Sequence, residues 1–446
     1  MKKISFFLLF LMIGVGNIWA QNHAAINFTL DQAVAYAWQH NYGMINSGKD
    51  LEVAKLKINE QVAAGLPQLN ATLTYHDNVA RPVLIIPGDL TGHPGQDIPV
   101  QFGARYDANL NGQLTQLIFD GRYLIGLKAA KISLEKTNKE FFKNKLAVKE
   151  QVSDAYFQVI SIKESLRIVD STLSVTKKMA IETHRIYEAG MIEDVDVDQV
   201  DLLVSNLEAS HTFLKNQYTI AIAFFKFYLG LGEGDQVKLK EGLSSLIRKK
   251  QSELIKIDKF NLNQSVDFQM VKTGKDLLNL QVKLAKAAYL PSINAIVNYE
   301  TQAQRNAWNF FAHDKWYQSA VIGVTMRIPV FSSGQRLSRL KQAKIAYEQA
   351  DVLEKQTATQ LGLEFQTAQS NYQNAETMYE NKLKNRKIAE IIYNKTTEKY
   401  IQGMASSLDL LNTHNQFLNA ENDYINAGLS LLKSAEKLQT LLTKAN

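Results

Sequence analysis

The sequence predicts a mainly α-helical chain with a minority of membrane β-strands, built from two copies of one unit. Three observations carry this prediction. Segments recur at a nearly constant offset, four stretches alternate apolar and polar residues, and long proline-free stretches place apolar residues three and four apart. Period two indicates strands, whereas a period near 3.6 indicates helices. Each unit should therefore hold a strand pair followed by a long helical hairpin.

The composition is that of a folding chain. Of 446 residues, 46% are hydrophobic and 21% are charged, which excludes a disordered chain. The mean hydropathy of −0.20 argues against a bundle of membrane-spanning helices. Cysteine is absent, so we expect no disulfide, thiol nucleophile or lipid-anchored cysteine. The net charge of +6 is mild and evenly spread, so no nucleic-acid partner is expected.

The first twenty residues read as an export signal. Lys2 and Lys3 precede a short apolar run that ends near Ile13, and the small residue Ala20 follows. This arrangement is typical of a secretory signal peptide cleaved near Ala20, although a buried N-terminal helix is the alternative. We therefore expect residues 1–20 to be removed.

Internal repeats define the domain organisation. The sequence LPQLNATLTY at residues 66–75 resembles LPSINAIVNY at residues 290–299. YEAGM at residues 187–191 matches YIQGM at residues 400–404, an offset of 213 that also relates Asp196 to Asp409. We expect the first copy to span residues 21–229, an equatorial linker residues 230–263, and the second copy residues 264–446.

Four segments alternate strictly enough to be strands. We expect them at about 68–78, 104–118, 292–303 and 317–330, each with one apolar and one polar face. Such alternation is typical of an outer-membrane strand, but also of a soluble antiparallel sheet. The export signal and the very polar second faces favour the membrane. A proline-rich stretch from Pro82 to Pro99 predicts a long irregular loop between the first two strands.

Each strand pair should lead into a long helical hairpin, at about 122–229 and 334–443. Proline is absent there, and Gly190 and Gly403 should mark the turns. The last helix has two adjacent apolar lanes, which predicts neighbours on two sides, as in a ring of helices. The first lane contains Leu410, Phe417, Tyr424, Leu431 and Leu438, and the second contains Leu411, Leu418, Ile425 and Leu432.

Four strands cannot close a barrel, because bacterial outer-membrane barrels begin at about eight strands. Open strand edges are not tolerated in lipid. Several chains must therefore pool their strands, and two or three copies would supply eight or twelve. An obligate homo-oligomer is expected.

No motif predicts chemistry. Residues 43–50 nearly match a phosphate-binding loop, but Asp50 stands where Ser or Thr is needed, and no strand precedes it. The acidic run at residues 194–201 more simply caps a restarting helix, as do Ser407 and Asp409 in the second copy. His211 and His414 should be packed or face a lumen. We expect no enzyme, no metal and no cofactor.

The repeated strand pair and hairpin, with YEAGM and YIQGM at the turns, resembles the TolC family of outer-membrane efflux proteins. Leu66-Pro67 and Leu290-Pro291 before each first strand are also typical of it. The resemblance covers nearly all of residues 21–446. It implies a homotrimer in the outer membrane, whose twelve-stranded barrel continues as a twelve-helix α-barrel across the periplasm.

The resemblance also implies a function and its residues. Such trimers are passive exit ducts of tripartite efflux or type I secretion systems, which dock a periplasmic adaptor and an inner-membrane transporter of the RND or ABC type. The docking tips would include Gly190, Met191, Gly403 and Met404. The periplasmic gate would include Asp196, Tyr400 and Asp409, with Asp196 linked to Tyr400. Ala405 replaces the basic residue of the best-known members, which predicts a weaker lock. A soluble periplasmic coiled-coil scaffold is the alternative.

Overall fold

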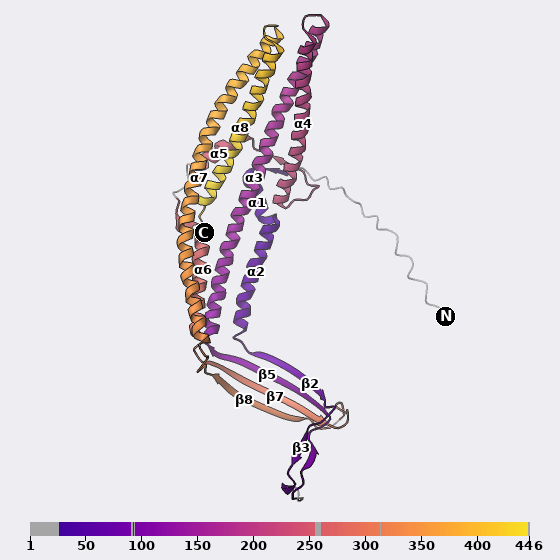
Figure 1. The fold of residues 1–446 in the computed structure, drawn as a ribbon, viewed down its shortest axis with the longest axis vertical. Coiled ribbons are helices and arrows are strands. Elements are labelled where there is room, and N and C mark those ends of the chain that lie inside the picture. The colour runs from indigo at the N-terminus through magenta and orange to yellow at the C-terminus, as the bar shows by residue number, and fades with distance from the viewer. Residues whose placement is uncertain (1–25, 91, 93, 255–259, 313, 445–446) are drawn as a thin grey trace, which may run out of the picture. The chain divides into compact units, whose positions relative to one another are not determined.

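The computed structural model describes residues 26–90, 92, 94–254, 260–312 and 314–444, so the predicted signal peptide lies outside the described residues. The chain is mainly helical with a minority of strands, as predicted (Figure 1). Its contacts divide it into two compact units. The first comprises Met1–Ile45, Lys145–Lys259 and Phe365–Leu442, and the second comprises Asn46–Asn144, Phe260–Glu364 and Thr443–Asn446.

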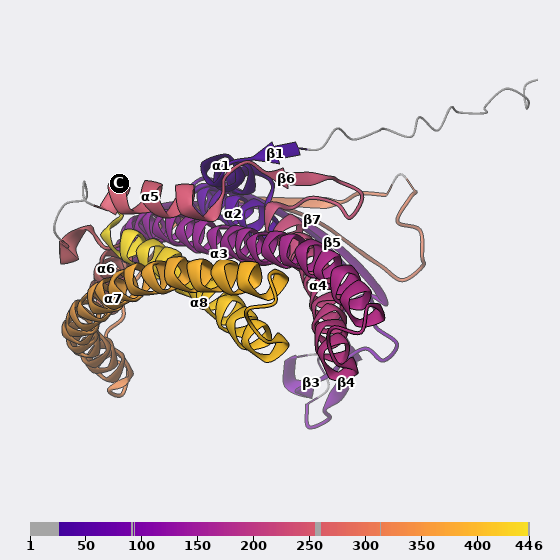
Figure 2. The same cartoon turned by 90° about the horizontal axis from the view of Figure 1, so that it is seen from above.

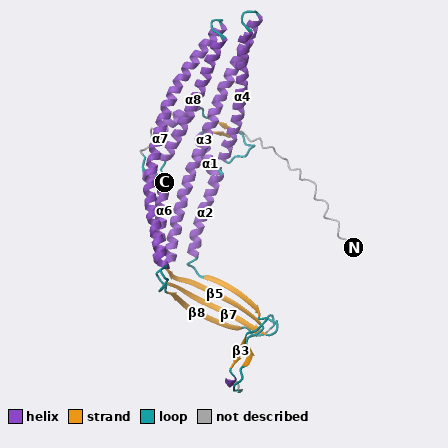
Figure 3. Cartoon of the chain, in the orientation of Figure 1, coloured by secondary structure: helices purple, strands orange, loops and turns teal. Residues whose placement is uncertain are grey.

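A four-stranded antiparallel sheet in the second unit holds all four alternating segments (Figure 3). Its order is β2 (Gln68–Asp77), β5 (Tyr106–Asp120), β7 (Ser292–Arg305) and β8 (Tyr317–Arg327). The register aligns the apolar residues on one face. Leu69 pairs with Leu114, Leu114 with Val297, and Val297 with Ile322. The four alternating patterns therefore merge into one continuous apolar face.

The opposite face of the sheet is polar. Thr72 pairs with Asn111, Asn111 with Glu300, and Glu300 with Ser319. Within the described residues, one edge of β2 and one edge of β8 have no strand partner. Unpaired edges expose backbone donors and acceptors, so they are sites for pairing with another strand.

The segment between β2 and β5 is more regular than predicted. Instead of an irregular loop, it contains β3 (Val83–Ile86) paired antiparallel with β4 (Ile98–Gln101), and the short 3-10 helix η1 (Gly88–Leu90). The prolines do not prevent this pairing, because Pro82 precedes β3 and Pro99 lies in a two-stranded ribbon, where proline is tolerated.

Two long helical hairpins follow the strand pairs. The first consists of α3 (Gly121–Glu188) and α4 (Asp194–Leu229), and the second of α7 (Gln335–Ile401) and α8 (Ser407–Leu442), as Figure 2 shows from above. The 68 residues of α3 extend about 100 Å at 1.5 Å per residue. In α8 the whole first apolar lane, from Leu410 to Leu438, is buried. In the part of the chain that is described, no helix is long and apolar enough to cross a bilayer.

Shorter helices accompany the hairpins. In the second unit these are most of α2 (Tyr42–Ala63), the 3-10 helix η2 (Leu262–Gln264) and α6 (Val266–Ala287). The first unit holds α1 (Leu30–His40) and α5 (Leu243–Leu254), together with β1 (Ile26–Phe28), which pairs in parallel with β6 (Val237–Leu239).

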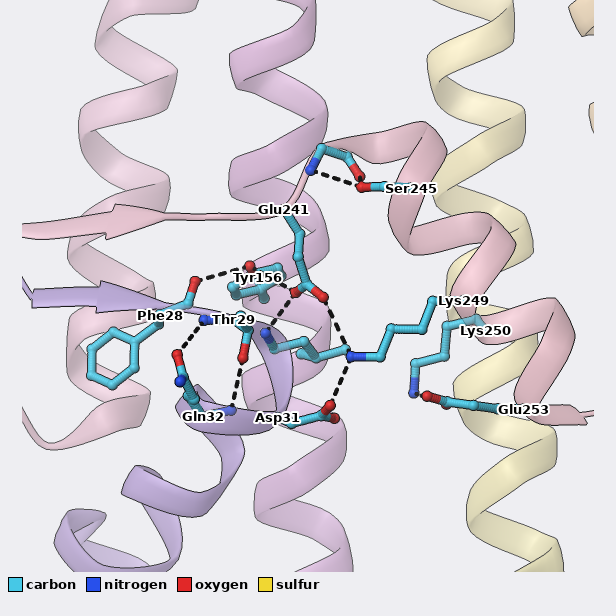
Figure 4. A network of polar contacts seen from close by, with 12 residues as sticks. Phe28, Thr29, Asp31, Gln32, Tyr156, Glu241, Ser245, Lys249, Lys250 and Glu253 are labelled. Carbon is cyan, nitrogen blue, oxygen red and sulfur yellow. Dashed lines mark hydrogen bonds and ion pairs between the residues drawn. The ribbon is translucent and has the colours of Figure 1, made fainter.

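Glu241 fixes the start of α1 (Figure 4). Its carboxylate accepts a 2.7 Å hydrogen bond from the Leu30 backbone N–H and a 3.0 Å bond from the Tyr156 hydroxyl. Lys249 lies 3.3 Å from the same carboxylate and 2.7 Å from that of Asp31. Because a buried backbone N–H needs a partner, Glu241 adds a side-chain anchor to a segment that the pairing of β1 with β6 already holds in place.

Candidate functional site: the hairpin tips

The two hairpin turns have the same backbone geometry. Gly190 and Gly403 both have φ of 72°, the left-handed conformation that glycine adopts most readily. In each turn the glycine N–H and the next N–H bond back to the helix. Met191 donates to the Ile186 carbonyl at 3.1 Å, and Met404 donates to the Lys399 carbonyl at 2.8 Å. This Schellman pattern explains why the tyrosine-to-methionine motif recurs.

The methionines after these glycines are unusually exposed. Met191 is 76% exposed and Met404 is 65% exposed. In a Schellman motif the residue at this position commonly packs against the last helical turn. Here both side chains instead project apolar, flexible surface from the ends of the hairpins, which suits a contact with another molecule.

The return helices start differently after the two tips. Asp409 forms a capping box at the start of α8: its carboxylate accepts the Ser406 hydroxyl at 2.7 Å, and the Ser406 hydroxyl accepts the Asp409 N–H at 3.1 Å. The hydrogen bonds from Ser406 hold the pKa of Asp409 below its usual value. The expectation that Ser407 also acts as a cap is wrong, since its side chain is directed elsewhere.

Ser407 ties the two hairpins together. Its hydroxyl donates a hydrogen bond to the carboxylate of Asp196, which joins the first turn of α8 to the first turn of α4. A second link joins α3 to α7, where the hydroxyls of Thr183 and Tyr400 lie 3.1 Å apart. Hydrogen bonds to a charged group are the stronger kind, so the Asp196 link should dominate.

A direct link between Asp196 and Tyr400 was expected, but each of these side chains bonds to a different residue. Among the described residues, no hydrogen bond joins these two side chains within one chain; each uses another partner. Burial raises the pKa of the Tyr400 hydroxyl, the hydrogen bond with Thr183 partly opposes this, and the nearby Asp196 carboxylate adds a smaller upward shift. Sequence motifs singled out Asp196 and Tyr400 but did not predict Ser407 and Thr183 as their hydrogen-bond partners.

A buried cluster lies beneath these links. It contains Met179, Tyr393, Leu410 and Phe417, with Tyr400 packed against it. His414 is fully buried beside it, edge-on to the Tyr393 ring at 5.4 Å, and neither imidazole nitrogen has a partner among the described residues. Burial lowers the pKa of His414 to about 4. The residue is therefore packed and neutral, as one of the two expectations had it.

Ion pairs also bind each hairpin internally. Arg386 on α7 bonds the carboxylate of Glu421 on α8 at 2.7 Å, and Glu421 is only 3% exposed. At the equivalent level of the first hairpin, Lys177 pairs with Glu208 at 2.5 Å, but that pair is half exposed. Glu208 and Glu421 lie at the repeat offset of 213, but only the ion pair of Glu421 is buried.

The acidic residues in the first turn of α4 form hydrogen bonds within the fold. Asp194 accepts its neighbour's backbone N–H at 2.9 Å, and Asp196 binds Ser407. Across the described residues, no group of three or more His, Asp or Glu side chains is arranged to hold a metal ion.

Comparison with known proteins identifies the family. The sequence pattern of the outer membrane efflux protein family matches residues 37–231 and 261–444. Outer membrane protein TolC of Vibrio cholerae is 21% identical over 332 residues, which are 74% of this chain and 69% of that protein.

Solved structures share the fold. VceC from Vibrio cholerae has a TM-score of 0.68 at 16% identity, over 93% of this chain and 96% of that one. The Campylobacter jejuni CmeC outer membrane channel has a TM-score of 0.69 at 16% identity, over 93% and 85%. Such identities establish the fold alone, whereas the pattern match covers most of both repeats. The chain therefore belongs to the outer membrane efflux protein family, a family of channels located in the outer membrane.

Proposed function

We propose that three copies of this chain form the exit duct of a tripartite efflux or type I secretion system. Their pooled strands would make one twelve-stranded barrel in the outer membrane, and their hairpins would make a twelve-helix tunnel through the periplasm. The duct would conduct passively, because an inner-membrane transporter supplies the energy.

The sheet is the observation that carries this proposal. It has one continuous apolar face, one polar face and two unpaired edges. Lipid excludes unpaired edges, so β8 of one copy should pair with β2 of the next. The apolar face would then meet lipid, and the polar face would line the lumen.

The hairpin tips support the proposed docking of an adaptor and the proposed closure of the periplasmic entrance. The exposed Met191 and Met404, together with the rigid turns at Gly190 and Gly403, suit docking of a periplasmic adaptor protein. Asp196 and Tyr400 would stabilise a closed entrance through Ser407 and Thr183. Asp409 would act indirectly, by fixing the start of α8.

Two neighbouring residues of β8 test the orientation of the sheet. Ile322 lies on the apolar face and Val321 on the polar face. Ile322→Lys should cost about 2–4 kcal/mol in the lipid midplane, whereas Val321→Lys should cost little. We expect the wild-type chain and Val321→Lys to fractionate with outer membranes and to give ohmic channels in planar bilayers without ATP, and Ile322→Lys to assemble poorly.

Equal assembly of both variants would refute the assignment of the two faces. A wild-type chain that stays in the soluble periplasmic fraction and gives no channels would instead favour the coiled-coil scaffold.

A further inference from the structure

Positive charge gathers where the strands meet the helices, contrary to the even spread expected from the sequence. Residues 120–134, 277–290 and 327–347 hold ten Lys and Arg and one Asp, a net charge of +9, so the rest of the sequence has a net charge of −3. These segments form the start of α3, the end of α6 and the start of α7, beside the ends of β5, β7 and β8 (Figure 3).

Four of the lysines in these segments belong to a sequence motif that occurs twice. The pattern G-x-x-L-x-x-L-K-x-A-K-I begins at Gly121 and again at Gly334, an offset of 213. It places two exposed lysines in the third turn of each long helix. We name these residues the junction lysines: Lys128, Lys131, Lys341 and Lys344.

The junction lysines have no acidic partners. Among the described residues, no carboxylate lies within ion-pair distance of any of them, although lysines farther along the same helices are paired. Lys139 pairs with Glu135, and Lys355 pairs with Asp351. Exposed lysines without a carboxylate partner on the chain are free to bind an anion from outside it.

Apolar side chains accompany this charge. Val330 is 87% exposed and Phe331 is 85% exposed, just after β8, and Leu124 and Leu337 lie one turn before the lysines and are half exposed. Exposed apolar residues beside unpaired lysines are typical of a surface that meets both hydrocarbon and headgroups.

The position of the lysines fits a headgroup layer. Lys128 and Lys341 lie seven residues after the glycines that start the motif, or about 10 Å along the helix axis. Helical side chains tilt toward the helix N-terminus, here toward the sheet, and a lysine reaches several ångströms further by snorkelling. The ammonium groups can therefore return to the headgroup layer, which extends about 5–8 Å beyond the hydrocarbon.

We propose that the junction lysines bind the phosphodiester headgroups of anionic glycerophospholipids in the periplasmic leaflet of the outer membrane. This inference rests on the proposed function in one respect, since it requires the sheet to lie in lipid. The contact would fix the depth of the sheet in the membrane and hold the start of α3 and α7 at its surface.

Spin-label spectroscopy of the purified full-length chain in vesicles tests this proposal. Nitroxide-labelled phosphatidylglycerol and phosphatidylcholine each report the lipid immobilised by the protein. At low salt we expect about a fivefold preference for phosphatidylglycerol, the factor that one lysine contributes near anionic lipid. The variant K128Q/K131Q/K341Q/K344Q should lose this preference, and high salt should reduce it in the wild type.

A matched control removes four other exposed lysines from the same two helices, as K163Q/K178Q/K384Q/K387Q. It should keep the preference. Equal loss in both variants, or retention in the first, would overturn the proposal, as would displacement of the labelled lipid by inorganic phosphate at constant ionic strength. Immobilised phosphatidylcholine reports insertion of the sheet, so its absence from the wild type would overturn the proposed function as well.

Discussion

Ser407→Ala removes the hydrogen bond to a charged group that joins the two hairpins near their tips, and it leaves the buried cluster below unchanged. The wild-type hydroxyl is almost fully buried and donates to the Asp196 carboxylate. Hydrogen bonds to charged groups contribute about 1.5–3 kcal/mol. Since 1.4 kcal/mol is a factor of ten, each chain's preference for the tied arrangement should fall about 10- to 150-fold.

Planar bilayer recordings measure this shift directly. If the tied arrangement closes the entrance, Ser407→Ala should raise the mean single-channel conductance, and Asp196→Ala should do so to a similar extent. The double variant should add little to either, because both changes break the same bond. Tyr400→Phe breaks only the neutral contact with Thr183, worth about 0.5–1.5 kcal/mol, and should have a smaller effect.

Ser406→Ala is the matched control. This adjacent serine bonds only within the capping box of α8, so its loss should weaken the helix start while keeping the cross-hairpin bond. Conductance that rises equally in Ser406→Ala and Ser407→Ala, or that is unchanged in Ser407→Ala and Asp196→Ala, would refute the reasoning.

Three further predictions concern stability. Because the pKa of His414 is lowered to about 4 in the folded state, its contribution to the free energy of unfolding is complete above about pH 6.5 and falls as the pH drops toward 4. Thermal unfolding should therefore show a free energy of unfolding about 2 kcal/mol lower at pH 5 than at neutral pH, and His414→Leu should abolish this difference. Gly403→Ala should cost about 1 kcal/mol at its left-handed position, whereas Gly362→Ala inside α7 should be stabilising; the same sign for both would contradict this, as measured by denaturant unfolding. Glu241→Ala should expose residues 26–40 to limited proteolysis, because the Leu30 N–H loses its side-chain acceptor and the Tyr156 hydroxyl keeps only the Phe28 carbonyl. Unchanged cleavage would count against that anchor.

The features of the fold that could be predicted from the sequence are those that depend on periodic spacing or on the internal repeat. Alternation located the strands, and the lane from Leu410 to Leu438 predicted the buried face of α8, because both depend on local spacing. Gly190 and Gly403 marked the turns because left-handed backbone favours glycine.

Contacts between elements were harder to predict. Whether Ser406 or Ser407 caps α8 depends on where the helix starts relative to α4, which no local pattern records. The unpartnered burial of His414 likewise depends on the packing of α7 against α8. The junction lysines were missed because charge was averaged over the chain, although their motif repeats at the same offset as the tips.

In the proposed trimer, three chains close one sheet by pairing β8 of one copy with β2 of the next. Because the chain lacks cysteine, Thr72→Cys on β2 can be combined with single cysteines at alternate positions of β8 from Ser319 to Thr325. Within a chain two strands separate β2 from β8, about 14 Å at the usual spacing, too far for a disulfide. Oxidation in outer membranes should therefore yield a covalent trimer for at least one combination, while single-cysteine variants give none. Failure of every combination, or products that stop at dimers, would contradict the account.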